Sequence, residues 1–407
     1  MSEGPRRRCV VLFYEGYLGL SPSTVNLSKA FAGAGYDVTV YATPTTTPSA
    51  GDMGDVAVRV LSPGGIARFL GDLGVGRLRL ARIARRFFPF GQVAAFSGRV
   101  LLAELAERGR AAARTVYVGI DMDAVLGALV CATLFGRPFL FLSLELTLTP
   151  SQRRGPRAAL IQLAYRRAAA ALTQGVDRLA MMTRDFRWEH PKVFILPNSP
   201  YDSPPAQATD SGLFRRRFAI APTQRIALQA GMIEDKSCCA ALARGFSGLE
   251  GWALVLHERT KHSPEEPYMR HLRSINADNL HLSLEPVPYD EIDQVFASAD
   301  VGLTFYEPSG PDDDDFRFIS SSGKLPNYLK HGKPVLVSDL PPLVEIVREF
   351  DCGIVIKDPS DRAEIGAALR RIDERYDEFS RNARRCFTER FDFGKAVQPV
   401  IEFANTL

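Results

Sequence analysis

Short apolar runs rich in β-branched and aromatic residues alternate with helical patterns along the whole 407-residue chain. The helical segments show apolar residues at i, i+3, i+4 and i+7, as over residues 292–299. Strands that alternate with helices form βαβ units, which build parallel sheets covered on both faces. The pattern therefore predicts an α/β fold. The predicted strands are residues 9–14, 37–41, 56–61, 115–120, 138–143, 170–174, 193–196, 225–230, 252–257, 279–284, 301–305, 334–338 and 353–356.

The alternation is interrupted once, near residue 203. Residues 201–212 are rich in Pro, Ser and Asp and have no periodicity, which is typical of a linker between domains. A chain of this length is too long for one ordinary core and suits two doubly wound domains. We expect a first domain over residues 1–203, a second over 204–390 and a final helix over 391–407 that returns to the first domain.

Composition excludes several classes of protein. A hydrophobic content of 46% and a charged content of 24% are ordinary for a soluble globular protein, and a net charge of +3 does not indicate nucleic-acid binding. The six cysteines lack metal-type spacing, which favours reduced core cysteines in a cytoplasmic protein. Glu15 interrupts the first apolar run, so no signal peptide is expected. The longest uncharged apolar stretch, 124–136, is shorter than the ~20 residues of a spanning helix.

Residues 321–339 show the pattern of a phosphate site. The small residues Ser321, Ser322 and Gly323 form a turn before Lys324, and a short amphipathic helix follows. The helix ends near Gly332, where a buried strand pattern begins. Free backbone N–H groups at a helix start, together with one ammonium group, attract a phosphate. The segment therefore predicts a phosphate contact at Lys324.

This segment resembles the nucleotide-diphosphate binding segment of the retaining GT-B glycosyltransferases of family four. In those enzymes a Ser-x-Asn-Lys turn precedes a helix that ends in Gly-x-Pro-Val, and residues 332–335 here read Gly-Lys-Pro-Val. Residues 197–198, 287–289 and 299–303 match in the same order. The resemblance implies two Rossmann-like domains facing across a cleft. It also implies a nucleotide-diphosphate sugar on the second domain, an acceptor on the first and no cofactor.

The resemblance also assigns donor contacts, with two departures. Gly231 and Lys236 match a Gly-Arg turn followed by a lysine, but Met232 stands at the arginine position. Asn327 stands where a glutamate bonds the donor ribose. The remaining donor-side candidates are His257, Pro288, Tyr306, Asp314 and Asp315. Alternatives without a ligand-binding role stay open: a solvated lysine at 236, a structural histidine at the strand end at 257 and a solvated acidic loop around 312–315.

In the first domain, the loop with Glu15, Gly16 and Gly19 follows the first strand. Its glycines allow a backbone to approach a ligand closely, so the resemblance places it beside the acceptor; a structural tight turn is the alternative. The loop lacks the spaced-glycine fingerprint, so a nicotinamide cofactor is not favoured.

Asp121 and Glu145 complete the catalytic candidates, with Lys324 and Lys236. Asp121 and Asp123 form an Asp-x-Asp, which binds metal in another glycosyltransferase fold, but we prefer a helix cap or an acceptor contact and expect no metal. Glu145 matches a family glutamate or is structural, and Leu144 replaces the histidine before it. A retaining enzyme tolerates that loss, because the leaving phosphate can accept the acceptor proton.

Residues 77–90 combine five arginines with Phe87, Phe88 and Phe90. This cluster suits peripheral contact with the inner face of a membrane, a lipid-linked or acidic acceptor, or a solvated helix.

Together with these patterns, the resemblance implies a glycosyltransferase that moves a sugar from a UDP, GDP or dTDP sugar to a hydroxyl or amine of a small-molecule, lipid or glycan acceptor. Retention and independence of metal are expected. Two alternatives stay open. One is a nucleotide-sugar epimerase or hydrolase on the same fold. The other is a catalytically silent binding subunit, in which Met232 and Asn327 reflect lost function.

Overall fold

The computed structural model describes residues 7–14, 18–44, 51–61, 79–107, 114–144, 156–186, 189–201, 212–275, 277–307 and 322–407. The side chains of residues 79–90, 156–157, 177, 181 and 184–186 are not described. The chain divides into two compact units. The N-terminal unit comprises Met1–Thr46, Asp52–Pro197 and Lys395–Leu407, and the C-terminal unit comprises Thr47–Gly51 and Asn198–Gly394.

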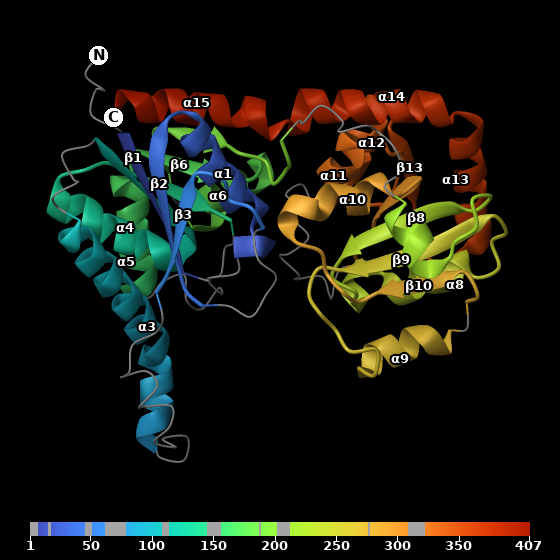
Figure 1. Ribbon diagram of the computed structural model, residues 1–407, viewed down its shortest axis with the longest axis horizontal. Coiled ribbons are helices and arrows are strands. Elements are labelled where there is room, and N and C mark those ends of the chain that lie inside the picture. Colours follow the sequence, from blue (N-terminus) through green and yellow to red (C-terminus); the bar gives the residue numbers. More distant parts are fainter. Residues whose placement is uncertain are drawn as a thin grey trace. The chain divides into compact units, whose positions relative to one another are not determined.

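The N-terminal unit is built on a seven-stranded parallel sheet of order β3-β2-β1-β4-β5-β6-β7 (Figure 1). Its central strands are runs of apolar residues because helices cover both faces. The strands are β1 (Arg7–Phe13), β2 (Tyr36–Ala42), β3 (Val56–Val60), β4 (Thr115–Ile120), β5 (Phe139–Ser143), β6 (Ala170–Thr173) and β7 (Val193–Ile195). The helices are η1 (Leu18–Leu20), α1 (Pro22–Gly33), α3 (Arg79–Ala106), α4 (Asp121–Phe135), α5 (Pro156–Arg167), α6 (Val176–Phe186) and α15 (Phe393–Thr406).

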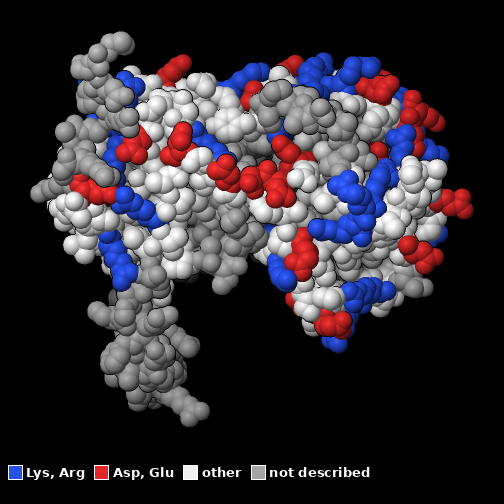
Figure 2. All heavy atoms as spheres, viewed as in Figure 1, with Lys and Arg blue, Asp and Glu red and all other residues white. Residues whose placement is uncertain are grey.

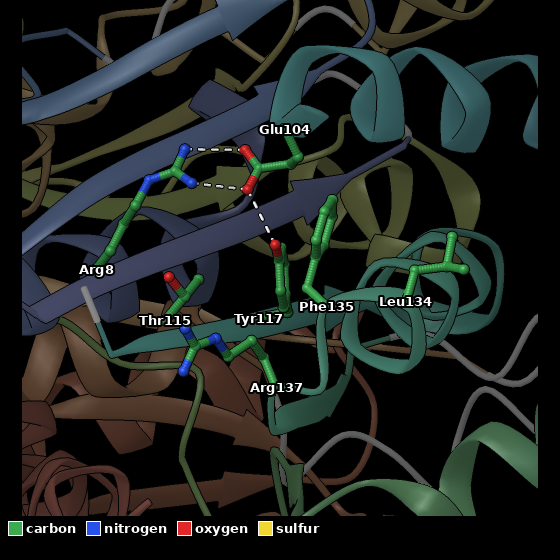
Figure 3. A pocket seen from close by; sticks show the side chains of 7 residues that line it. All are labelled: Arg8, Glu104, Thr115, Tyr117, Leu134, Phe135 and Arg137. Carbon is green, nitrogen blue, oxygen red and sulfur yellow. Dashed lines mark hydrogen bonds and ion pairs between the residues drawn. The ribbon is translucent and has the colours of Figure 1, made fainter. Parts of the chain in front are cut away.

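A buried ion pair ties helix α3 to this sheet (Figure 3). The Arg8 guanidinium donates to both oxygens of Glu104, at 2.7 and 2.9 Å. The hydroxyls of Tyr41 and Tyr117 each donate to the same carboxylate at 3.0 Å. Burial and the neighbouring Glu104 carboxylate raise the pKa of Tyr117, so its hydroxyl stays protonated and remains a donor. Both carboxylate oxygens are therefore satisfied within the protein.

The C-terminal unit has a six-stranded parallel sheet of order β10-β9-β8-β11-β12-β13. The strands are β8 (Arg225–Gly231), β9 (Trp252–Glu258), β10 (Leu280–Ser283), β11 (Val301–Thr304), β12 (Val335–Ser338) and β13 (Gly353–Ile356). The helices are α7 (Leu213–Phe218), η3 (Asp235–Ser237), α8 (Cys239–Phe246), α9 (Pro267–Ser274), η4 (Tyr289–Glu291), α10 (Ile292–Ala297), α11 (Lys324–Lys330), α12 (Pro341–Phe350), α13 (Arg362–Glu374), α14 (Tyr376–Cys386) and the π-helical turn η6 (Phe387–Phe391).

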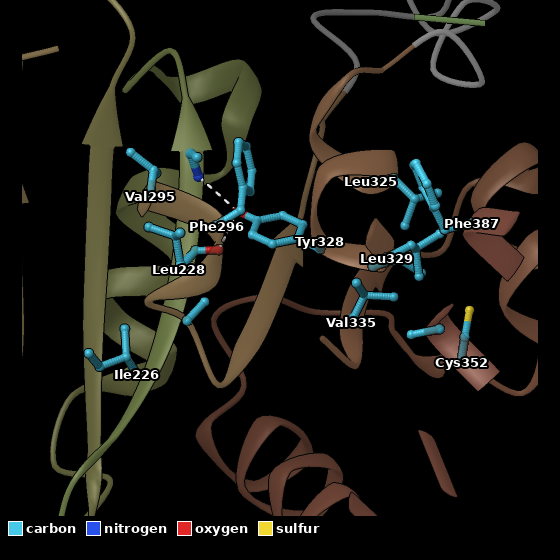
Figure 4. Packing of buried hydrophobic residues seen from close by; sticks show 14 of the residues in the cluster. Ile226, Leu228, Val295, Phe296, Leu325, Tyr328, Leu329, Val335, Cys352 and Phe387 are labelled. Carbon is cyan, nitrogen blue, oxygen red and sulfur yellow. Dashed lines mark hydrogen bonds between the residues drawn. The ribbon is translucent and has the colours of Figure 1, made fainter. Parts of the chain in front are cut away.

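Two apolar clusters cover the faces of this second sheet. One contains α10, α11 and α12 residues, among them Phe296, Leu325, Tyr328 and Leu329 (Figure 4). The other contains α8, α9 and α13 residues. A sheet buried on both faces is the doubly wound arrangement, so the predicted fold class is confirmed in both units.

Each of the thirteen predicted strands corresponds to a strand, within one or two residues at its ends. The predicted linker around residue 203 lies outside the described residues, which resume at Gly212. The last residues of the chain pack on the N-terminal unit, where the Phe403 ring contacts Phe194 and the Tyr36 hydroxyl donates to Asn405. Among the described helices, none combines the length and the apolar character needed to cross a bilayer.

Candidate functional site

The carboxyl end of β8 meets the start of α11 at Gly231 and Lys324. Gly231 has a φ of +132°, and a Cβ placed there would lie 2.5 Å from Cε of Lys324. Real Cβ atoms do not come so close to another carbon, so only glycine lets the lysine side chain cross the end of this strand. The structure therefore brings together two of the residues that the sequence assigned to the donor.

Tyr328 fixes the position of α11 (Figure 4). Its buried hydroxyl donates to the Leu228 carbonyl at 2.6 Å and accepts from the Ala230 amide at 3.0 Å. Its ring fills the space above Gly302, where a Cβ would lie 2.2 Å away. Burial raises the pKa of Tyr328, which keeps the hydroxyl protonated. Residues 324 and 328 are about one helical turn apart, so this contact with β8 also orients Lys324.

The Lys324 ammonium lies 4.5 Å from the centre of the Tyr306 ring, in a cation–π contact. The Tyr306 hydroxyl forms a short hydrogen bond with Ser322 Oγ. The Tyr306 backbone is fixed by Ser338, whose Oγ accepts from the amide at 2.8 Å and donates to the carbonyl at 3.0 Å. No described carboxylate forms an ion pair with Lys324. The Tyr306 ring therefore holds the Lys324 ammonium in place, and this charge has no ion-pair partner among the described residues.

Glu258 joins the loops that follow β8 and β9. Its carboxylate is 1% exposed and accepts from the amides of Ile233 at 2.7 Å and Arg259 at 2.9 Å. The amide and hydroxyl of Thr260 contact the same carboxylate at 3.3 Å. A buried carboxylate is tolerated when backbone N–H groups satisfy it, and it then holds both loops in one arrangement.

Arg259 lies in the second of these loops. Its guanidinium nitrogen is 3.6 Å from the sulfur of Met232, and its amide also donates to the Gly231 carbonyl at 3.1 Å. A guanidinium thus reaches position 232 from the neighbouring strand, although the sequence has methionine where the family pattern has arginine. Sequence reasoning missed Arg259, Glu258 and Tyr328. The available signal was that Arg259 directly follows β9, at the sheet edge where such folds bind ligands.

Two further donor candidates lie around these loops. Lys236 is exposed in η3, and its carbonyl accepts from the Glu307 amide at 2.9 Å, which joins the loops after β8 and β11. Asn327 is 9% exposed and donates through Nδ2 to the Gly323 carbonyl at 2.7 Å. Its Oδ1 has no hydrogen-bond partner among the described residues. A buried acceptor without a partner costs free energy, so this oxygen suits a ligand hydroxyl.

His257 requires a correction. Its ring is 2% exposed, and Nδ1 lies 2.9 Å from Ser283 Oγ. Burial, aided by the nearby Arg217 charge, lowers its pKa to about 4, so the ring is neutral at pH 7. We therefore do not retain it as a direct donor contact. Pro288 is half-buried before η4, with no described contact to Lys324. Ser321, Asp314 and Asp315 lie outside the described residues.

In the N-terminal unit, Asp121 lies at the carboxyl end of β4 with a φ of +57°. Its buried Oδ1 accepts from the Leu144 amide at 2.6 Å, which joins the ends of β4 and β5. The residue assigned to the N-cap of α4 is Ile120, which forms no side-chain cap bond. Asp121 and Asp123 lie in the first turn of this helix, and the helix-cap interpretation of these two residues stays a prediction. A non-glycine residue in the left-handed region costs about 1–3 kcal/mol and is most frequent at functional sites.

The other acceptor-side candidates are only partly described. Gly19 is half-buried in η1, whereas Glu15, Gly16 and Glu145 lie outside the described residues. Within the described part of the chain, no group of three or more His, Cys, Asp or Glu residues could hold a metal ion.

No protein-family model and no curated protein matches the sequence. Solved structures match over almost the whole chain. HepE from Anabaena in complex with UDP and glucose superposes with a TM-score of 0.66 at 13% identity, covering 99% of this chain and all of the other. Sucrose-phosphate synthase from Thermosynechococcus elongatus gives 0.64 at 14% identity, covering 98% and 99%. WaaG, a glycosyltransferase of lipopolysaccharide biosynthesis, gives 0.59 at 14% identity, covering 97% and 99%. The chain therefore has the GT-B fold, with two Rossmann-like units, that these proteins share.

Proposed function

We propose that this protein is a glycosyltransferase that moves a sugar from a nucleoside-diphosphate sugar to a hydroxyl or amine. One observation carries the proposal: Lys324 and Arg259 both reach the turn after β8, beside Gly231 and Met232. Open α/β sheets bind ligands at the carboxyl ends of their strands, and a diphosphate is an anion that two cations can neutralise. The fold supports this, since a structure that shares it holds UDP.

In this proposal Lys324 and Arg259 contact the diphosphate, and Lys236 is a third cation in the same loop region. Asn327 accepts a hydrogen bond from a ribose hydroxyl through Oδ1, which has no partner among the described residues. Tyr306, Ser322 and Gly323 hold Lys324 in position. The N-terminal unit provides the acceptor side, with Asp121, Glu145 and the loop of Glu15, Gly16 and Gly19 as candidate contacts.

The chemistry that these residues supply is stabilisation of the leaving group. As the bond between sugar and diphosphate breaks, negative charge grows on the phosphate oxygens, and fixed cations lower the barrier without reorganising. A metal ion has the same role in other enzymes, and here the side-chain cations replace it. We expect activity to persist after chelator treatment. A loss that manganese restores would contradict this part of the proposal.

The proposed reaction retains the anomeric configuration of the donor. An inverting reaction needs a base on the face opposite the leaving group, and Leu144 stands where a histidine would reach the reaction centre. On the front face, the leaving phosphate itself accepts the acceptor proton. Proton coupling constants at the anomeric carbon of the product measure the outcome. An inverted linkage would identify a carboxylate of the N-terminal unit, Asp121 or Glu15, as a catalytic base.

Release of nucleoside diphosphate from a panel of UDP, GDP and dTDP sugars tests the function itself. A transferase releases nucleoside diphosphate at its full rate only when a suitable acceptor is present. A hydrolase releases nucleotide without an acceptor, an epimerase returns a changed sugar on the same nucleotide, and a silent subunit binds without release. Each outcome other than acceptor-dependent release contradicts the proposal.

A further inference from the structure

Three helices of the N-terminal unit expose pairs of large aliphatic side chains. The pairs are Leu102 and Leu105 on α3, Val130 and Leu134 on α4, and Leu160 and Leu163 on α5. These six side chains are between 38% and 67% exposed. The members of each pair are three or four residues apart, so each pair lies on one side of its helix and points outward.

The three helices are neighbours. Helix α4 packs against both α3 and α5. All three connect strands in the same direction across the sheet, from β3 to β4, β4 to β5 and β5 to β6. Because such crossovers are right-handed, the helices cover the same face of the sheet. We name the outward surface formed by these six side chains the α3–α4–α5 face. Soluble monomers rarely expose so many neighbouring aliphatic side chains without an interaction partner.

The charges on this face have one sign. Among the described side chains of α3, α4 and α5, the carboxylates are Glu104 and Asp121, which are buried, and Asp123, which is half-buried. The exposed charges are Arg166 and Arg167 at the end of α5. In the sequence the first half of α3 adds Arg79, Arg82, Arg85 and Arg86.

Helix α3 continues well beyond its neighbours. Its 28 residues correspond to about 42 Å at 1.5 Å per residue. Figure 1 shows its first half projecting past α4 and α5. The arginines and phenylalanines of residues 79–90 belong to this projecting half, so the basic aromatic segment and the exposed aliphatic pairs share one continuous helix.

We infer that the α3–α4–α5 face docks on an anionic lipid bilayer. Aliphatic side chains that point outward enter the boundary between headgroups and acyl chains, while neighbouring arginines contact lipid phosphates. A second copy of the chain is a poorer occupant, because a two-fold contact would set the arginines of one copy against those of the other, and the described side chains of these helices include no exposed carboxylate to separate them. The inference widens the sequence-based prediction from residues 77–90 to three helices, and it does not rest on the proposed catalytic function.

Flotation with lipid vesicles tests this inference on the full chain. We expect binding to vesicles of phosphatidylcholine mixed with phosphatidylglycerol, and weaker binding to phosphatidylcholine alone or at high salt. The double variant Leu134→Gln with Leu163→Gln should lower the partition coefficient about tenfold. The double variant Arg166→Gln with Arg167→Gln should lower it about tenfold on anionic vesicles only. All four side chains are exposed, so folding is retained.

The matched control is Val60→Thr. Val60 is 57% exposed, comparable with 60% for Leu134, but it lies on the edge strand β3. The control should bind vesicles as the parent protein does. The inference is overturned if the parent protein binds no anionic vesicle, or if Val60→Thr weakens binding as much as the leucine variant does. A concentration-dependent dimer that the leucine variant abolishes, without vesicle binding, would show that a second copy is the occupant.

Discussion

The two units share one plan but use their charged residues differently. Acidic and basic side chains lie on the surface of both (Figure 2). In the N-terminal unit, Arg8 and Glu104 are buried and form hydrogen bonds with each other. Two tyrosine hydroxyls donate the remaining hydrogen bonds to the Glu104 carboxylate. In the C-terminal unit, Lys324 and Arg259 reach the end of β8, and neither forms an ion pair within the described part of the chain. A satisfied buried pair holds a structure together, whereas a positioned cation without a counter-ion is available for an anionic ligand.

A pocket of about 230 Å³ lies beside the Arg8–Glu104 pair of the N-terminal unit (Figure 3). Thr115, Phe135 and Arg137 also line it. The Glu104 carboxylate is fully engaged by its protein partners, and Arg8 also donates to Glu107 at 2.8 Å. Removing one partner would leave the other charge buried without its counter-ion. The comparison therefore predicts that loss of one partner affects folding of the N-terminal unit rather than donor binding.

The largest expected effect follows from removing Glu104. Glu104→Ala leaves the buried Arg8 guanidinium and two tyrosine hydroxyls with fewer partners, which should lower the free energy of unfolding of the N-terminal unit by about 3–5 kcal/mol. Hydrogen exchange in each unit, with urea unfolding, measures this. Glu104→Gln, which keeps an acceptor for the tyrosines, should cost less. Equal loss of protection in the C-terminal unit would break the comparison, because the two units would then not be stabilised separately.

A second effect concerns the pH dependence of the C-terminal unit. Because the folded pKa of His257 is about 4 and the ordinary value is 6.5, the unfolded chain binds a proton more readily over this range. The stabilising contribution is therefore complete above pH 6.5 and is lost as the pH falls toward 4, by about 3 kcal/mol in total.

His257→Gln isolates this contribution. The difference in unfolding free energy between parent and variant should change between pH 6.5 and 4 and stay constant above that range. Carboxylates that titrate at low pH cancel in the difference. A pH-independent difference would show that His257 is not buried as a neutral ring.

The strands of both sheets could be predicted from the sequence, because parallel strands buried on both faces are continuous apolar runs, as at Val10–Phe13 and Val335–Val337. It also indicated Gly231 and Lys324, since a small-residue turn before a lysine is a local pattern. These features depend on neighbours in the chain, and local patterns carry that information.

The contacts that the sequence did not predict are set by residues far apart in the chain. Glu258 reads as an ordinary charged residue, and its burial depends on amides contributed by the loops after β8 and β9. His257 was placed at the donor because it ends a strand, but Ser283 of the next strand holds its ring inside the unit. Arg259 reaches Met232 only because β8 and β9 are adjacent in the sheet.

The third prediction sharpens the functional half of the comparison. If Lys324 stabilises the leaving diphosphate, Lys324→Ala should lower turnover about a hundredfold, equivalent to about 3 kcal/mol. The folded stability should change little, because Lys324 has no described carboxylate partner. Lys357→Ala, which removes an exposed lysine after β13, is the matched control and should keep full activity. Unchanged turnover in a folded Lys324→Ala variant would remove the central residue of the proposed site.

The smallest effect is expected at Arg259, which is more exposed than Lys324 and therefore more strongly screened by salt. Arg259→Ala should weaken UDP binding about tenfold, or about 1.4 kcal/mol, in titration calorimetry, and more at low salt. Arg273→Ala, on the exposed side of α9, is the control.

A rescue variant tests the position of this cation. Because the Arg259 guanidinium lies 3.6 Å from the Met232 sulfur, Met232→Arg in the Arg259→Ala background returns a cation to the same place and should restore most of the affinity. If Arg259→Ala leaves UDP binding unchanged while Lys324→Ala weakens it, the donor site is correct and Arg259 lies outside it. If neither variant affects UDP binding, the carboxyl end of β8 is not the donor site, and the cations there have no role that distinguishes this unit from the N-terminal one.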